Sequence, residues 1–209
     1  MIVILDYGVG NLGSIQNMIL RAGGRAIISS DINLIASAKG FILPGVGAFD
    51  HGMKKLKSSG MLDILESRVI KHNVPILGVC LGMQMLFNNS EEGDIPGLGW
   101  IDGSVKKFKF ERQDSLIKLK IPHMGWNIAT PEVQQSLFKG FEDDARFYFV
   151  HSYHVVCNDK ENVLATTQYG YDFTSSVYKN NIYGVQFHPE KSHRFGMKLF
   201  KNFMEICEC

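Results

Sequence analysis

Short β-branched segments alternate with stretches of helical spacing through the first half of the chain. Segments expected to be strands lie at residues 2–5, 26–29, 41–43 and 74–79. Between the first two, Leu12, Ile15, Ile19 and Ala22 fall on one face of an amphipathic helix. This alternation of strand and helix predicts an α/β fold, an open and mostly parallel sheet with helices on both faces.

The second half, from Gly97 to about Tyr183, is richer in glycine, aromatic and β-branched residues. It predicts added strands, mixed or antiparallel, and residues 147–155 are the strongest candidate for one continuous strand. Helical spacing returns from residue 195 onward. Because no linker, repeat or low-complexity segment interrupts the chain, we expect residues 1–209 to form a single domain.

Composition narrows the class of protein. Hydrophobic residues make up 45% and charged residues 21% of the chain, as in a globular protein, and no apolar run reaches the roughly 20 residues that span a bilayer. The net charge is +1 without a basic block, which argues against nucleic acid and anionic membranes as partners. The N-terminus has no basic leader, so we expect a cytoplasmic protein.

The four cysteines are too few and too unevenly spaced for a disulfide framework. We expect Cys207 and Cys209 to be surface thiols near a frayed terminus. A metal site could be drawn from His151, His154 and Cys157. However, residues three apart face opposite sides of a strand, so we predict no metal.

Glycines follow the first expected strand in the pattern Gly8-x-Gly10-x-x-Gly13, and Asp31 lies about 20 residues further on. Spacing and context match a dinucleotide-binding fingerprint, in which the acidic residue binds the ribose. The alternative is a tight strand-to-helix turn, which glycines permit in any parallel α/β protein. The pattern alone leaves both possibilities open.

Gly78-x-Cys80-x-Gly82 lies between an apolar strand and a segment of helical character at residues 81–87. This is the arrangement of a nucleophile elbow, with sulfur in place of the serine oxygen. Side chains at either glycine would clash in so sharp a turn, and the helix N-terminus behind Cys80 would favour its thiolate form. The alternative is a buried structural cysteine.

A thiolate nucleophile needs a base, and His188 follows the apolar segment Val185-Gln186-Phe187. Pro189 disfavours the α conformation at His188, so Glu190, two residues on in an extended chain, can orient the imidazole. Cys80, His188 and Glu190 would then form a catalytic triad. The glycine-rich turn at Gly45, Val46 and Gly47, with the N–H of Leu81, could supply an oxyanion hole.

These motifs, in this order, resemble those of the class I (triad) glutamine amidotransferases. Further motifs resemble the glutaminase subunits of imidazole glycerol phosphate synthase, and the likeness covers essentially the whole chain. They are Asp6-Tyr7-Gly8-Val9-Gly10-Asn11, His123-Met124-Gly125-Trp126-Asn127, Phe147-Tyr148-Phe149-Val150-His151-Ser152-Tyr153 and His188-Pro189-Glu190-Lys191-Ser192.

The resemblance implies hydrolysis of glutamine through a thioester on Cys80, without a cofactor, and passage of ammonia to a separate (β/α)8-barrel cyclase in histidine biosynthesis. It further implies that Gly47, Gln84, Ser152 and Tyr153 hold the substrate. Residues implied to face the partner in a heterodimer are Asn11, Met124, Trp126, Tyr148 and Lys191. The motifs fill residues 6–192, so we expect the ammonia acceptor to bind on another chain.

Two alternatives to this interpretation remain. A paralogous glutaminase could supply ammonia for amidine formation on a surface-polysaccharide sugar, and its motifs would look alike because the acceptor site lies on the partner. A catalytically vestigial partner-binding module is the alternative of another class, although the triad, the oxyanion turn and Gln84 are all present.

Overall fold

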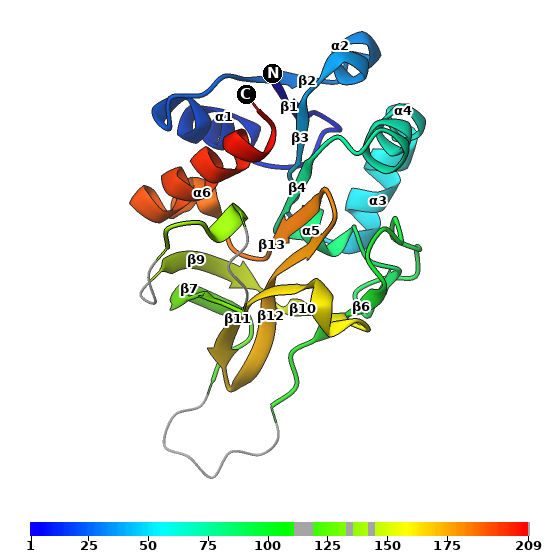
Figure 1. Cartoon of the computed structure of the whole chain (residues 1–209). Helices are drawn as coiled ribbons and strands as arrows, with labels where there is room; N and C mark the ends of the chain where they lie inside the picture. Colours follow the sequence, from blue (N-terminus) through cyan, green and yellow to red (C-terminus); the bar gives the residue numbers. More distant parts are fainter. Residues whose placement is uncertain (111–118, 133–135, 142–144, 209) are drawn as a thin grey trace.

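The computed structural model describes residues 1–110, 119–132, 136–141 and 145–208. Its main sheet has eleven strands, and the order β2-β1-β3-β4-β13-β12-β10-β6-β5 runs across it (Figure 1). The first five strands in that order are mutually parallel. They are β2 (Ala26–Ser29), β1 (Ile2–Leu5), β3 (Gly40–Leu43), β4 (Ile76–Val79) and β13 (Ile182–Val185). The predicted parallel half is therefore confirmed, with shifts of one or two residues at two strand starts.

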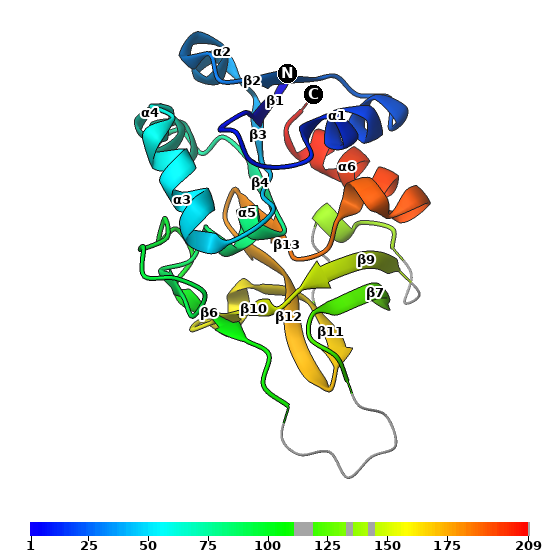
Figure 2. The ribbon, with the colours of Figure 1, turned by 180° about the vertical axis from the view of Figure 1, so that it is seen from behind.

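Helices cover both faces of the parallel half (Figures 1 and 2). Alternate residues of β1 point to opposite sides, as a pleated strand requires. Ile2 and Ile4 join one apolar cluster with α1 (Leu12–Arg21) and α6 (His193–Ile206), while Val3 and Leu5 join another with α3 (Phe49–Ser58) and α4 (Leu62–Glu66). A π-helical segment (Ser67–Lys71) continues α4, and α2 (Ile32–Ser37) follows β2.

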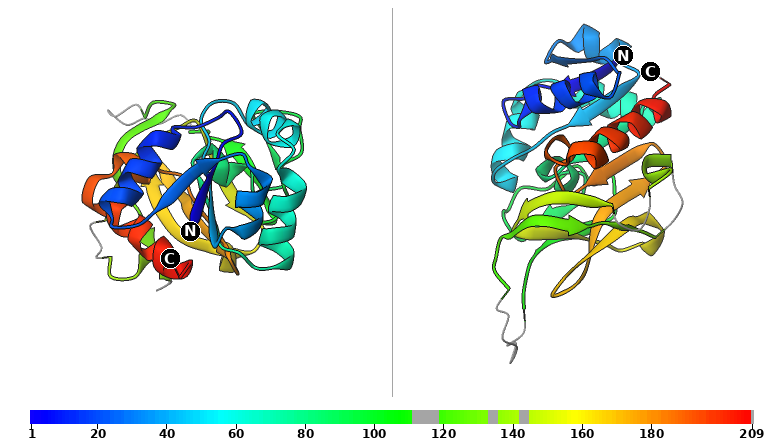
Figure 3. Two further views of the ribbon diagram at one scale, coloured as in Figure 1. Left: turned by 90° about the horizontal axis from the view of Figure 1, so that it is seen from above. Right: turned by 90° about the vertical axis from the view of Figure 1, so that its left-hand side faces the viewer.

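The second half adds antiparallel strands, as predicted. β12 (Tyr171–Lys179) pairs with β13, β10 (Tyr153–Cys157) with β12, and β6 (Gly103–Lys107) with β10. The remaining strands of this sheet are β5 (Asn89–Ser90), β8 (Thr130–Pro131) and β11 (Val163–Tyr169). A separate ribbon of β7 (His123–Ile128) and β9 (Arg146–His151) lies beside it (Figure 3).

Residues 147–155 are not one strand, so that prediction is wrong. The chain bends at Ser152, and β9 pairs with β7 in the ribbon while β10 pairs with β6 and β12 in the main sheet. The apolar pattern runs through the bend because both strands are buried on one side. Such a pattern reports burial and cannot report a change of pairing partner.

The dinucleotide hypothesis loses its structural support. Gly8 and Gly10 have φ of +82° and +118°, so the turn itself requires them, and a Cβ on Gly10 would lie 2.9 Å from Pro44 Cβ. Asp31 is the N-cap of α2, and its carboxylate accepts a hydrogen bond from the Asn33 N–H at 2.8 Å. Both features therefore serve the fold.

Three further observations concern the sequence predictions. Cys207 is only 5% exposed and lies beneath Gly40 of β3, so its prediction as a surface thiol is wrong; α6 keeps its helical hydrogen bonds up to this residue. Cys209 lies outside the described residues. Among the described residues, no helix has the length and apolar character needed to cross a membrane.

Candidate active site

Cys80 occupies the sharp turn between β4 and the short helix α5 (Leu81–Gln84). Its backbone is in a strained conformation, with φ +55° and ψ −112°. A Cβ on Gly78 would lie 2.8 Å from the Gly82 carbonyl, and one on Gly82 would lie 1.9 Å from the Leu43 carbonyl oxygen. The predicted need for glycine on both sides of the cysteine is therefore confirmed.

The helix behind Cys80 is shorter than residues 81–87 suggested, because α5 ends after one turn and the chain continues through further turns. One turn carries only a small helix dipole, and its effect on Cys80 stays a prediction. His188 lines the same pocket as Cys80 and interacts with it electrostatically.

The His188 imidazole and the Glu190 carboxylate form a buried pair. Nδ1 lies 2.8 Å from Oε1, and the two side chains are only 3% and 2% exposed. The predicted contact is present, but the extended path expected between the residues is wrong. Pro189–Lys191 form a 3-10 turn, η4, which curls Glu190 back beneath the imidazole because Pro189 starts the turn with a pre-set φ.

Backbone contacts hold His188 against the ribbon. Its N–H donates to the Tyr148 carbonyl at 2.8 Å, and its own carbonyl accepts from the Ser192 hydroxyl at 2.6 Å. The Tyr148 N–H in turn donates to Ser192 Oγ at 3.0 Å. The imidazole therefore has a fixed position between β9 and η4.

The electrostatics of His188 favour an imidazolium. Burial alone would lower its pKa, but the interactions of His188 with Cys80 and Glu190 outweigh burial, and the pKa rises to about 10. With Nδ1 on Glu190, Nε2 is buried and makes no geometrically good hydrogen bond within the described part of the chain. That nitrogen is thus available for proton transfer at Cys80.

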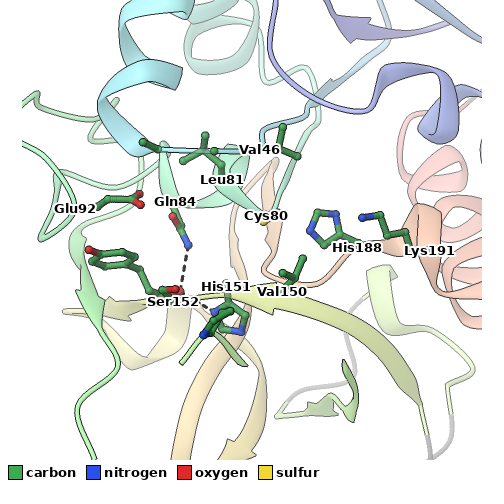
Figure 4. A pocket seen from close by; sticks show the side chains of 14 residues that line it. Val46, Cys80, Leu81, Gln84, Glu92, Val150, His151, Ser152, His188 and Lys191 are labelled. Carbon is green, nitrogen blue, oxygen red and sulfur yellow. Dashed lines mark hydrogen bonds between the residues drawn. The ribbon is translucent and has the colours of Figure 1, made fainter. Parts of the chain in front are cut away.

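A pocket of about 550 Å³ opens on Cys80 and His188 (Figure 4). Gln84 and Glu92 lie at one end, and His188 and Lys191 at the other, with Cys80 between them. The predicted residues that line it, beyond the cysteine and histidine, are Val46, Gly47, Leu81, Gln84, Ser152, Tyr153 and Lys191. Residues from four distant parts of the sequence therefore meet at one cavity.

The turn predicted as an oxyanion hole forms one wall of this pocket. Val46 and Gly47 line the pocket, and Gly47 has φ +89°, whereas Gly45 lies behind them against the Gly82 nitrogen. As the first residue of α5, Leu81 has an N–H without a partner inside the helix. The use of these N–H groups for an oxyanion stays a prediction.

A family model described as glutamine amidotransferase class-I matches residues 3–207. The chain belongs to the class I glutamine amidotransferases. The catalytic roles of Cys80, His188 and Glu190 stay a prediction, which the geometry of the elbow and of the buried pair supports.

Relatives and solved structures agree with this assignment. This amidotransferase is 54% identical over 205 residues to imidazole glycerol phosphate synthase subunit HisH 2 of Methanococcus maripaludis, covering 98% of this chain and 99% of the relative. It is 50% identical to the protein of the same name from Pseudomonas aeruginosa, covering 99% and 100%. A crystal structure of a glutamine amidotransferase matches with a TM-score of 0.71 at 20% identity, covering 100% of this chain and 99% of the other, and supports the fold alone.

Sequence reasoning gave no site role to several residues in or beside the amidotransferase pocket, among them the lining residues Ala48, Pro122, Val150 and His151. Glu92 lines the pocket, and its Oε2 accepts from the Phe49 N–H at 3.0 Å; burial raises its pKa although that hydrogen bond opposes the rise. Gln186 is fully buried and its Nε2 lies 3.7 Å from Cys80 Sγ. Tyr7 donates its buried hydroxyl to the Pro44 carbonyl. Tyr7 and His151 carried a local signal because they lie within motifs named above, whereas Glu92 and Gln186 lie in none of those motifs.

The residues predicted to face a partner come from the β7–β9 ribbon, from η4 and from the start of α1. Trp126 and Tyr148 contact each other at 6.3 Å between ring centroids, and Lys191 Nζ lies 5.7 Å from the Tyr148 ring centroid. Met124 is 62% exposed on the same strand as Trp126, which is 48% exposed. Asn11 is exposed just before α1. A partner-binding role for these residues stays a prediction.

The premise used against a metal site needs correction. Because the chain bends at Ser152, His151 and His154 both pack on Phe108, with ring centroids 5.2 and 4.8 Å away, and do not face opposite sides of one strand. Within the described ranges, no group of His, Cys, Asp or Glu has an arrangement that could hold a metal ion.

Proposed function

We propose that this chain is the glutaminase subunit of imidazole glycerol phosphate synthase, which hydrolyses glutamine and passes the ammonia to a separate cyclase subunit in histidine biosynthesis. The observation that carries the proposal is one pocket that joins Cys80 to the buried His188–Glu190 pair. The chain that contains this pocket is about 50% identical in sequence, over essentially its whole length, to subunits of that name. We further propose that residues 1–209 act as one amidotransferase domain in the cytoplasm.

The first half-reaction uses the thiolate. Sγ of Cys80 attacks the side-chain amide carbon of glutamine, and the carbonyl electron pair moves onto oxygen, where N–H groups of Leu81 and of the turn at Gly45, Val46 and Gly47 stabilise it. The His188 imidazolium then protonates the amide nitrogen. The C–N bond breaks, ammonia leaves, and a thioester on Cys80 remains.

The second half-reaction regenerates the enzyme. Neutral His188 removes a proton from water, the hydroxide attacks the thioester, and the C–S bond breaks to release glutamate and the thiolate. Glu190 holds the same imidazole nitrogen throughout, so Nε2 faces the reacting atoms in both steps.

The far end of the pocket suits the amino-acid group of glutamine. Glu92 offers a carboxylate to the substrate ammonium, and Gln84 turns its carbonyl oxygen toward the same end (Figure 4). Ser152 and Tyr153 line the neighbouring wall. A substrate bound between Glu92 and Cys80 would therefore be held at both of its polar ends.

The partner is the (β/α)8-barrel cyclase that the resemblance implies. Ammonia released into water would be protonated and lost, so the site that makes it needs a dry contact with the site that uses it. Trp126, Tyr148 and Lys191 lie beside the pocket and supply an aromatic and cationic surface for such a contact. We expect Tyr148 to lie near the ammonia exit.

The test is glutamate release and imidazole glycerol phosphate formation by the chain combined with a histidine-pathway cyclase from the same cell. Cys80→Ala should abolish both, whereas Cys157→Ala, a cysteine outside this pocket, should leave both unchanged. Wild-type activity in Cys80→Ala would refute the mechanism. Glutamate release that requires a sugar-modifying partner instead of the cyclase would assign the ammonia to sugar amidination.

A further inference from the structure

A buried line of polar side chains connects β7 to the glutamine pocket. The His123 Nδ1 and His151 Nε2 atoms are 3.0 Å apart, and His151 Nδ1 is 2.7 Å from the Tyr153 carbonyl oxygen. Asn127 Nδ2 is 3.2 Å from His123 Nε2. Both histidines are buried, at 3% and 6% exposure, and neither has a role in the proposed chemistry at Cys80.

The hydrogen positions in this line follow from one fixed point. A carbonyl oxygen only accepts, so the proton of neutral His151 must be on Nδ1 and its Nε2 must accept. His123 must therefore donate from Nδ1, which leaves its Nε2 as an acceptor. Burial lowers the pKa of His151 to about 3 and that of His123 to about 4, so both rings are neutral at physiological pH.

The amide of Asn127 closes the line at its other end. Its Oδ1 accepts from the Ile128 N–H at 2.8 Å, and its Nδ2 also donates to the Gln168 carbonyl at 3.0 Å. These contacts leave Nδ2 as the group that faces His123, so the amide donates to His123 Nε2. Every hydrogen bond from Asn127 to the Tyr153 carbonyl thus points in the same direction.

The line reaches the substrate pocket at His151, which lines it, and at the Tyr153 carbonyl. The carbonyl also accepts from Gln84 Nε2 at 3.2 Å, and the same Nε2 donates to Gln186 Oε1 at 2.9 Å. Two acceptors fix the orientation of the Gln84 amide, because the flipped amide would place oxygen against oxygen. The Gln84 oxygen is therefore turned into the pocket, as Figure 4 shows.

We propose that Asn127, His123 and His151 are positioning residues for glutamine, a one-directional hydrogen-bond relay that fixes the Tyr153 carbonyl and through it the Gln84 amide. The proposal rests on the glutaminase function and adds to it a specific device for substrate binding. His154 belongs to the same aromatic cluster but is outside the relay, since its Nε2 pairs with the Tyr171 hydroxyl at 2.9 Å.

The test compares His123→Phe with the matched control Tyr171→Phe in the complex with the cyclase. Phenylalanine keeps the ring that stacks on Tyr169 at 4.0 Å and removes both relay hydrogen bonds, whereas the control removes one hydrogen bond of the same cluster outside the relay. We expect the glutamine KM of His123→Phe to rise about 10-fold with kcat within about threefold, and the control to stay within about twofold. Equal KM values in the two variants would overturn the proposal.

A second variant covers the case in which His123→Phe does not fold. Asn127→Leu is a neutral change at a partly exposed position that removes the donor to His123 Nε2, so the relay loses the hydrogen bond that anchors it at β7. We expect a similar rise in the glutamine KM. An unchanged KM in folded Asn127→Leu would also overturn the proposal.

Histidine ring NMR on the full chain tests the relay without turnover. Correlations between ring protons and both ring nitrogens distinguish the two neutral forms, and we expect His123 and His151 to carry their proton on Nδ1. A proton on Nε2 of His151 would refute the relay even if the wild-type complex is an active glutaminase. If the wild-type complex shows no glutamate release that depends on Cys80, the proposed function is refuted, and the NMR result is unaffected.

Discussion

Gly82→Ala tests whether the elbow at Cys80 depends on close backbone contact. A Cβ at this position would lie 1.9 Å from the Leu43 carbonyl oxygen, whereas ordinary contact begins at 3.4 Å, so β3 and α5 must separate by about 1.5 Å (3.4 minus 1.9). Backbone cannot rotate away as a side chain can. We therefore expect the free energy of unfolding to fall by about 3 kcal/mol.

The same displacement should reduce catalysis in the molecules that remain folded. Leu43 precedes the Pro44–Gly47 turn, so its shift moves the proposed oxyanion donors, and an error of about 1 Å costs on the order of 100-fold in rate. Urea unfolding and glutamate release by the cyclase complex measure the two effects.

Gly13→Ala is the control for the glycine replacement. It lies in α1 with open space around a Cβ, and it should raise stability by about 0.5–1 kcal/mol without changing kcat. If the free energy of unfolding of Gly82→Ala is within about 0.5 kcal/mol of wild type and its activity is equal, the close contact between Gly82 and Leu43 does not shape the elbow as argued.

Three further predictions address other parts of the site. Glu190→Gln removes one of the two groups that raise the pKa of His188 to about 10. The alkaline loss of glutaminase activity should therefore move to lower pH, and kcat should fall at least about 100-fold. An unshifted pH profile would show that Glu190 does not set this pKa. Tyr7→Phe leaves the buried Pro44 carbonyl without its hydrogen-bond donor. The free energy of unfolding in urea should fall by about 1–2 kcal/mol, and kcat should change more than KM. A selective rise in KM would argue against a role at the oxyanion turn. Trp126→Ala should raise the Kd for the cyclase about 10-fold in calorimetry while Tm stays constant, because the side chain is half-exposed; unchanged affinity would remove it from the interface.

The parts of the site that the sequence predicts well are local. Gly78, Cys80 and Gly82 lie within five residues, and each has a steric or chemical reason to be there. The His188–Glu190 contact is local too, although a 3-10 turn replaces the extended path we expected. Few backbone conformations can join residues so close in sequence, so the residue types alone predict the local geometry well.

The parts that sequence reasoning missed depend on distant segments. Glu92 reaches the pocket because the Phe49 N–H holds its carboxylate, and nothing near Glu92 in the sequence reports that contact. The bend at Ser152 depends on which strands pair on either side of it. Likewise, the roles of His123 and His151 follow from the hydrogen bond that joins two strands of the ribbon.

The β7–β9 ribbon has one buried face and one exposed face. One face carries His123, Phe149 and His151, which are buried, while Met124 and Trp126 on the other face are exposed. Substitutions on the exposed face cost little stability, since they change few packed atoms. On the proposed function, a substitution on the exposed face would change the surface offered to the cyclase while the buried face and the glutamine pocket keep their packing.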